Sequence, residues 1–226
     1  MKVFLTYNDQ YNGIYKTQVI DVLKMYQSEG IKFKLISFIS AKDFFKQKKQ
    51  IFENYSNALI LPMIPKVKNW HLNSLILKFF LKRADLIIAR GIFATNLALL
   101  SKKKSAKVIY NGRGAIYSEQ LEYGVYNGTR IEGDIFQLEK KAVLNSDKRI
   151  SISESLINYW RENYEYKDTF HEIIPSCTSF FSNSEKMIFK ENSETKIIFS
   201  GSSAKWQSYD IMCKHFSKFL SLNVNL

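Results

Sequence analysis

The chain has 226 residues, with 33 Lys and Arg against 21 Asp and Glu, and a formal net charge of +12. It is 46% hydrophobic with only 9 Gly and 3 Pro, which excludes disordered and collagen-like chains. No apolar run approaches the ~20 residues that a membrane-spanning helix needs. The N-terminus lacks the apolar stretch of a secretory signal, and the two cysteines lie far apart. These features favour a cytoplasmic protein with reduced thiols and no metal site.

Short apolar runs alternate with longer segments whose apolar residues recur at helical spacing. The strand-like runs are 2–6, 32–38, 58–61, 85–89, 107–110, 149–153 and 171–174. The main helix-like segments are 15–29, 41–55, 72–83, 92–101, 132–146 and 154–163. Strands separated by helices are typical of a parallel sheet with helices on both faces. We therefore predict an α/β fold with a Rossmann-like, doubly wound parallel sheet.

The alternation stops at residues 178–195, a polar segment rich in Ser and Asn that we interpret as a linker. Residues 196–200 and a helix over 207–220 then begin a new strand–loop–helix unit. One strand and one helix cannot bury both faces of the strand. We expect a first domain over 1–177 and a truncated second domain over 196–226.

The ligand crevice of a doubly wound sheet lies at the carboxyl ends of its strands. Gly13 follows the first predicted strand, Arg90 the fourth, and Arg113 with Gly114 the fifth. A glycine near a helix N-terminus lets backbone approach phosphate closely, and an arginine offers a two-pronged donor to phosphate or carboxylate. The alternative is an arginine that only satisfies carbonyls at the strand end. The GxGxxG and P-loop motifs are absent, which disfavours dehydrogenases and P-loop nucleotide hydrolases.

Six segments resemble, in their order and spacing, a known family. They are GIYKTQVIDVL, DLIIARG, KVIYNGRGAIYSEQ, LEKKAVLNSDKRISISESLINYW, EIIPSC and KIIFSGSSAKWQ. Together they span nearly all of the chain and resemble the retaining GT-B glycosyltransferases of the group 1 type, glycosyltransferase family four. The resemblance implies two Rossmann-like domains facing each other across a cleft. The first would hold the acceptor, and the second most of the nucleotide-sugar.

The resemblance also assigns roles to residues at the strand ends. Arg113 and Glu119 match part of an Asp-x-Arg-Gly…Glu-Glu pattern and are the candidate catalytic residues, although Asn111 and Gln120 replace its first Asp and last Glu. The candidate donor-binding residues are Gly13, Gly201, Ser202 and Lys205. The candidate acceptor-binding residues are Arg90, Gly114, Ser153 and Glu154. No metal-binding DxD triplet is present, so we expect neither a metal nor a cofactor.

The implied reaction transfers a sugar from a nucleotide-sugar to a glycan or lipid-linked glycan during surface polysaccharide synthesis. The segments 41–55 and 72–83 mix Lys with aromatic residues, so we expect peripheral contact with the anionic inner membrane face. Two lysine-rich helix faces in water are the alternative interpretation.

Two other functions remain open. A Rossmann-like module could bind an anionic ligand without chemistry. A nucleic-acid-binding protein would also suit the charge, but no RNP motif, zinc finger or helix-turn-helix pattern supports it. We therefore expect no nucleic-acid partner.

Overall fold

The computed structural model describes residues 1–64, 67–129, 131–176 and 208–222. The chain divides into two units, residues 1–181 and 182–226, and in the second the structure describes helix α9 (Tyr209–Leu222). The predicted linker, the strand over 196–200 and the candidate residues Gly201, Ser202 and Lys205 lie outside the described residues. Their assignments stay predictions.

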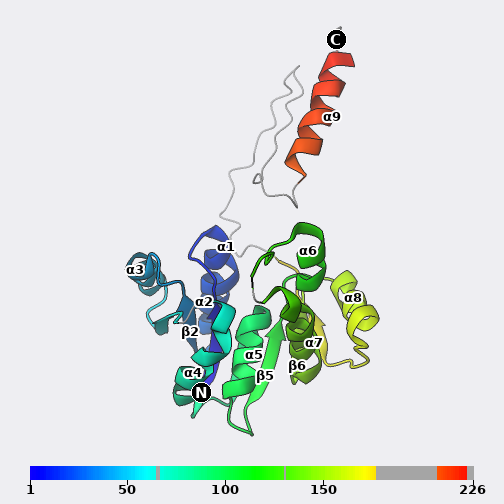
Figure 1. The fold of residues 1–226 in the computed structure, drawn as a ribbon. Coiled ribbons are helices and arrows are strands. Elements are labelled where there is room, and N and C mark those ends of the chain that lie inside the picture. The colour runs from blue at the N-terminus through cyan, green and yellow to red at the C-terminus, as the bar shows by residue number, and fades with distance from the viewer. Residues whose placement is uncertain (65–66, 130, 177–207, 223–226) are drawn as a thin grey trace. The chain divides into compact units, whose positions relative to one another are not determined.

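The first unit is built on one parallel sheet of seven strands in the order β3-β2-β1-β4-β5-β6-β7 (Figure 1). The strands are β1 (Lys2–Tyr7), β2 (Phe33–Ile39), β3 (Ala58–Pro62), β4 (Leu86–Arg90), β5 (Lys107–Asn111), β6 (Lys148–Ser151) and β7 (His171–Ile173). Central β1 pairs with β2 and β4, so Phe4 lies opposite Leu35 on one side and Ile88 on the other. The predicted α/β, Rossmann-like sheet is confirmed.

Helices cover both faces of the sheet. They are α1 (Gly13–Tyr15), the π-helix η1 (Lys16–Ile20), α2 (Asp21–Ser28), α3 (Phe44–Asn54), the 3-10 helix η2 (Val67–Leu72), α4 (Asn73–Leu81), α5 (Gly91–Ser101), α6 (Ile116–Tyr123), the 3-10 helix η3 (Glu132–Asp134), α7 (Ile135–Asn145) and α8 (Glu154–Tyr164). The apolar side chains of α2 and α3 pack on one face. Those of α4, α5, α7 and α8 pack on the other, as the right-handed crossovers of this strand order require.

Several helices differ from their predicted bounds. The segment predicted as one helix over 15–29 contains the π turn of η1 between α1 and α2. Helix α3 begins only at Phe44, because Asp43 adopts a positive φ of 61° that no helical residue has. Helix α6 was not predicted at all. No described helix is long and apolar enough to span a membrane.

Gly112, directly after β5, makes room for the largest side chain of the core. Trp160 on α8 is fully buried and packs on Tyr110 with 5.4 Å between ring centroids. A Cβ atom on Gly112 would lie 2.6 Å from Cζ2 and 2.9 Å from Cη2 of Trp160. The indole ring cannot yield easily, because the core around it is closely packed.

Gly112→Ala should therefore lower the free energy of unfolding by about 2 kcal/mol, the usual cost of overpacking a core. Gly133→Ala in η3 is the matched control, because a Cβ there has no atom within 4 Å and the residue has no positive φ. We expect it to change stability by less than about 1 kcal/mol. Urea unfolding followed by Trp fluorescence measures both, and equal midpoints for the two variants would contradict the packing argument.

Candidate functional site

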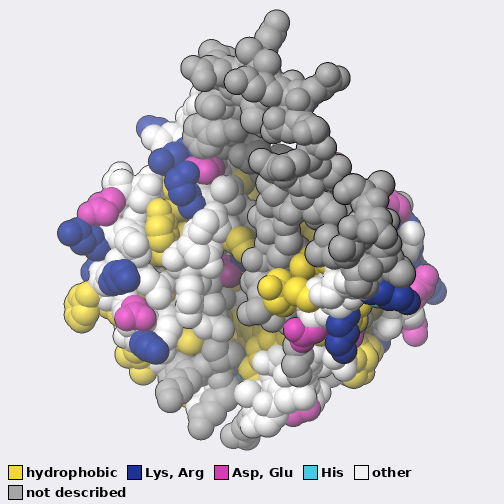
Figure 2. Space-filling view, turned by 90° about the horizontal axis from the view of Figure 1, so that it is seen from above, with side chains coloured by type: hydrophobic (Ala, Val, Ile, Leu, Met, Phe, Trp, Pro, Cys, Tyr) yellow, Lys and Arg dark blue, Asp and Glu magenta, His cyan; other side chains and the backbone are white. Residues whose placement is uncertain are grey.

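The carboxyl ends of the strands, beside α1 and α6 in Figure 1, bring together polar side chains from distant parts of the chain. Figure 2 looks onto this edge, and Lys and Arg side chains lie toward both sides of the visible face. We call the following five residues the arginine network: Asp9, Gln18, Arg90, Arg113 and Ser176. They come from η1 and from the ends of β1, β4, β5 and β7.

Arg90 is held by a carboxylate of the protein itself. Its Nη1 donates to both oxygens of Asp9, at 2.8 and 2.9 Å, and its Nη2 donates to Oε1 of Gln18 at 2.7 Å. Burial raises the pKa of Asp9, and the charges of Arg90 and Arg113 together with the Arg90 hydrogen bonds oppose that rise. Arg90, which we predicted to bind the sugar acceptor, thus forms an ion pair with Asp9. Its binding of a substrate stays a prediction.

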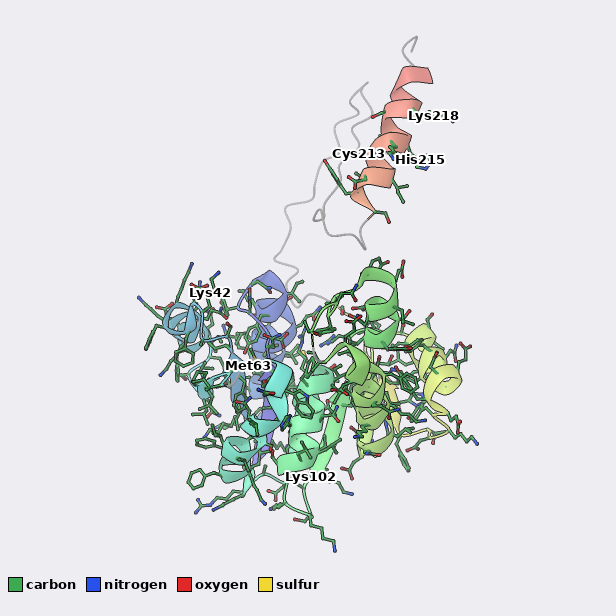
Figure 3. All side chains as sticks on the ribbon, in the orientation of Figure 1. Lys42, Met63, Lys102, Cys213, His215 and Lys218 are labelled. Carbon is green, nitrogen blue, oxygen red and sulfur yellow. The ribbon has the colours of Figure 1, made fainter. Side chains whose placement is uncertain are left out.

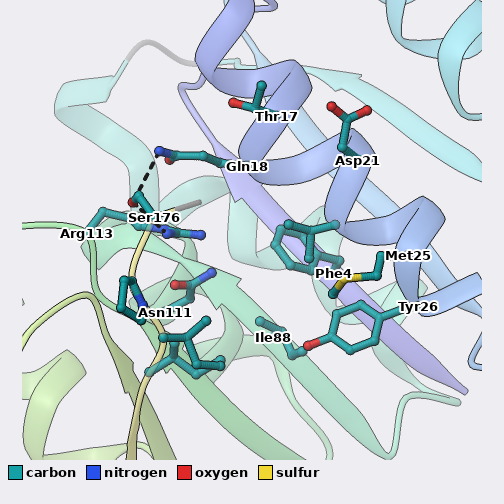
Figure 4. Close-up of a pocket in the computed structure, with 14 residues that line it drawn as sticks. Phe4, Thr17, Gln18, Asp21, Met25, Tyr26, Ile88, Asn111, Arg113 and Ser176 are labelled. Carbon is teal, nitrogen blue, oxygen red and sulfur yellow. Dashed lines mark hydrogen bonds between the residues drawn. The ribbon is translucent and has the colours of Figure 1, made fainter. Parts of the chain in front are cut away.

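Ser176 joins Arg113 to the rest of the network. Nη1 of Arg113 donates to Oγ of Ser176 at 3.4 Å, and Nε2 of Gln18 donates to the same oxygen at 3.5 Å (Figure 4). Both bonds are long, so a ligand with anionic oxygens can replace them at low cost. The network therefore places the guanidinium of Arg113 at the strand ends, beside the hydroxyl of Ser176.

A pocket of about 160 Å³ opens beside Arg113 (Figure 4). The sheet supplies its floor, and α2 supplies one apolar wall that includes Val22, Met25 and Tyr26. The floor residues are Phe4, Ile88, Asn111 and Ile150. Asn111 is only 4% exposed, and its Oδ1 has no hydrogen-bond partner among the described residues. An apolar pocket with a few polar groups is the usual form of a small-molecule site.

The candidate catalytic residues lie in one loop and the helix that follows it. A Cβ on Gly114 would collide with Oε1 of Glu119, so the Glu119 side chain folds back toward the loop that carries Arg113. Burial raises the pKa of Glu119 above its ordinary value. The structure thus brings Arg113, Gly114 and Glu119 together.

Glu139, which the sequence analysis did not single out, holds this helix in place. It is fully buried on α7, and it accepts hydrogen bonds from the backbone N–H groups of Ile116 and Tyr117 at 3.2 and 2.7 Å. Tyr164 donates its hydroxyl to the same carboxylate at 2.9 Å. Burial raises the pKa of Glu139 to about 7, although these three hydrogen bonds oppose the rise. The sequence did contain a sign of this role, because Glu139 lies among the apolar positions that form the buried face of the predicted helix 132–146.

The stability of the protein should depend on pH through Glu139. Because its pKa is higher in the folded than in the unfolded chain, where it is near 4.5, folding favours the protonated form. Its stabilising contribution is complete below about pH 4.5 and is lost as pH rises through about 7. Glu139→Gln removes this contribution, so the stability difference between wild type and variant should change over that range. Unfolding midpoints at several pH values measure it, and a constant difference would contradict the raised pKa.

Three other predicted site residues lie outside the arginine network. Ser153 caps α8, because its Oγ accepts a hydrogen bond from the N–H of Leu156 at 3.2 Å, and Glu154 accepts one from Arg161 at 3.0 Å. Gly13 begins α1, and a Cβ there would meet no atom within 4 Å. The fold therefore gives no steric reason for glycine at position 13. The ligand-binding roles of these residues remain predictions.

Metal-ligating side chains do not gather in the part of the chain that the structure describes. No group of three or more His, Cys, Asp or Glu side chains there could hold a metal ion. Cys213 and His215 lie on α9 (Figure 3).

Comparison with known proteins supports the fold. Neither a family model nor a curated protein sequence matches the chain. Among solved structures, the fold is similar to that of Alr3699/HepE from Anabaena, crystallised in complex with UDP and glucose. The TM-score is 0.54 at 11% sequence identity, over 78% of this chain and 44% of that chain. The present chain therefore matches less than half the length of that structure.

Proposed function

We propose that this chain contains the acceptor-binding domain of a retaining GT-B glycosyltransferase, which transfers a sugar from a nucleotide-sugar to a glycan or lipid-linked glycan. The observation that carries the proposal is the arginine network at the carboxyl edge of a Rossmann-like sheet, beside a pocket. Both lie where doubly wound folds bind their ligands. The similarity to a fold crystallised with UDP and glucose and the six family-like segments support the same assignment.

The chemistry of sugar transfer suits the groups at this edge. The bond between the anomeric carbon of the sugar and the diphosphate oxygen breaks as the acceptor oxygen bonds to that carbon. The leaving diphosphate thereby gains negative charge, which a nearby guanidinium stabilises. In this proposal Arg113 acts on the diphosphate, and Gly13 approaches the donor. Glu119 receives the proton of the attacking acceptor hydroxyl, a task to which its raised pKa is better matched than an ordinary carboxylate. No step requires a metal or a cofactor.

A turnover experiment tests the proposal. The whole protein that contains this chain is incubated with a panel of UDP- and GDP-sugars, with and without glycan and lipid-linked acceptors, because the resemblance assigns most of the nucleotide-sugar site to the second domain. Release of nucleoside diphosphate and labelled product are measured together. We expect release that depends on one donor and increases with acceptor. Tight donor binding without turnover in the presence of acceptors would favour the non-catalytic module, and neither binding nor turnover would contradict both functions.

A further inference from the structure

Helix α4 has two apolar faces, of which only one is covered. Its Asn73, Leu77 and Leu81 are fully buried, and Nδ2 of Asn73 donates to the Tyr7 hydroxyl at 3.1 Å. These contacts fix the rotation of the helix on the sheet. The opposite face therefore cannot turn inward without breaking the core.

The uncovered face carries a continuous apolar stripe. It consists of Leu72, the last residue of η2 directly before α4, at 45% exposure, and of three residues on α4, Leu75 at 74%, Ile76 at 46% and Phe79 at 64%. The spacing i, i+3, i+4, i+7 places these side chains side by side on a helix. We call these four residues the α4 stripe. Soluble proteins expose scattered apolar side chains, whereas a contiguous group marks an interaction surface.

Cations border the α4 stripe. Lys78, Lys82 and Arg83 are all exposed, and Nζ of Lys82 lies 5.0 Å from the centroid of the Phe79 ring. Long basic side chains beside an apolar stripe can extend to phosphate groups while their stems stay in apolar surroundings. In a two-fold dimer through this face, the cationic borders of two copies would lie close together and repel each other. The charges therefore favour an anionic partner over a second copy.

We propose that the α4 stripe inserts into the surface of an anionic bilayer, with Lys78, Lys82 and Arg83 at the level of the lipid phosphates. An apolar helix face with a basic border is the usual composition of an interfacial helix. This proposal is supported by the exposure and charge of α4, and it does not depend on the sugar-transfer proposal. If both hold, the membrane surface presents the lipid-linked acceptor to the same domain.

Helix α3 provides the matched control. It is also basic, and Phe45 is 85% exposed, but only Phe45 and Phe52 are exposed apolar residues on it. They are seven positions apart with no exposed apolar side chain between them, so they form no contiguous stripe. The sequence also led us to expect membrane contact from segment 41–55, but because α3 has no contiguous apolar stripe, we assign the contact to α4 alone. Phe45→Ser thus removes a ring that is more exposed than Phe79, 85% against 64%, from a surface outside that assignment.

Vesicle flotation of the whole chain tests the proposal, with phosphatidylcholine vesicles alone and with phosphatidylcholine mixed with phosphatidylglycerol. We expect binding only to the anionic vesicles, and weaker binding at high salt. Phe79→Ser should weaken vesicle binding about tenfold or more, because the variant loses a Phe side chain that the bilayer would bury. Lys78→Gln and Lys82→Gln should each weaken it roughly fivefold. Phe45→Ser should bind like wild type, and circular dichroism verifies that each variant folds.

Three results would overturn the proposal. One is binding that does not depend on anionic lipid, and another is an equal loss of binding in Phe45→Ser and Phe79→Ser. The third is a dimer in analytical ultracentrifugation that Phe79→Ser converts to a monomer while vesicle binding persists. That result would assign the α4 stripe to a second copy of the chain. Because no sugar is involved, failure here leaves the turnover experiment unaffected.

Discussion

Asp9→Asn should lower the free energy of unfolding by about 3 kcal/mol, because it leaves the guanidinium of Arg90 without its carboxylate. The Arg90 and Asp9 side chains are only 12% and 26% exposed, so water cannot fully replace the lost partner. The amide oxygen of Asn can accept one hydrogen bond but carries no charge. Urea unfolding at neutral pH measures the loss.

Two further variants separate this ion pair from a general effect of charge. Asp85→Asn is the same substitution at a side chain that is 67% exposed and pairs with Lys103, so its loss should be much smaller. Combining Asp9→Asn with Arg90→Met should recover part of the stability, since no unpaired charge is then buried. Equal losses for Asp9→Asn and Asp85→Asn would contradict a structural role for the Asp9–Arg90 pair.

Arg113→Ala should reduce kcat for sugar transfer about 100-fold, the usual effect of removing one donor that stabilises developing charge. Arg113→Lys keeps the charge but loses the two-pronged geometry, so its kcat should fall between those of alanine variant and wild type. Lys24→Ala removes an exposed cation from α2 and is the control for net charge. Steady-state kinetics of nucleoside diphosphate release provide both kcat and KM.

The pattern of the loss matters as much as its size. An effect on kcat and kcat/KM together indicates an interaction made in the transition state. A rise in KM with unchanged kcat would mean that Arg113 only binds substrate, which would contradict its place among the catalytic residues. An unchanged unfolding midpoint ensures that the variant keeps its fold.

The sheet was predictable because its signals are local. Each buried strand is a short apolar run, and β1 and β2 are buried on both faces nearly throughout, as parallel strands between helices must be. The bounds of the helices were less predictable. The positive φ of Asp43, which delays the start of α3, depends on the surrounding loop and leaves no mark in the periodicity.

The candidate site was predictable only in part, because its contacts join distant residues. The sequence predicted Arg90 and Arg113 at strand ends, but Asp9, which forms an ion pair with Arg90, is 81 positions away in the chain. Helix α6 depends on a carboxylate from α7, and Glu139 is 22 positions from the Tyr117 N–H that it accepts. Such tertiary contacts override local propensity. The residues of 116–123 alone therefore do not indicate where α6 begins.

Hydrogen exchange with and without ligand tests the central claim, that the carboxyl edge of this sheet binds the substrates of sugar transfer. The protein is exchanged alone, with the nucleotide-sugar that turnover selects, and with its acceptor added. We predict slower exchange in residues 8–18, 111–119 and 174–176, and no change in 102–106 at the opposite edge of the sheet. Protection confined to other regions, or none at saturating ligand, would contradict the claim.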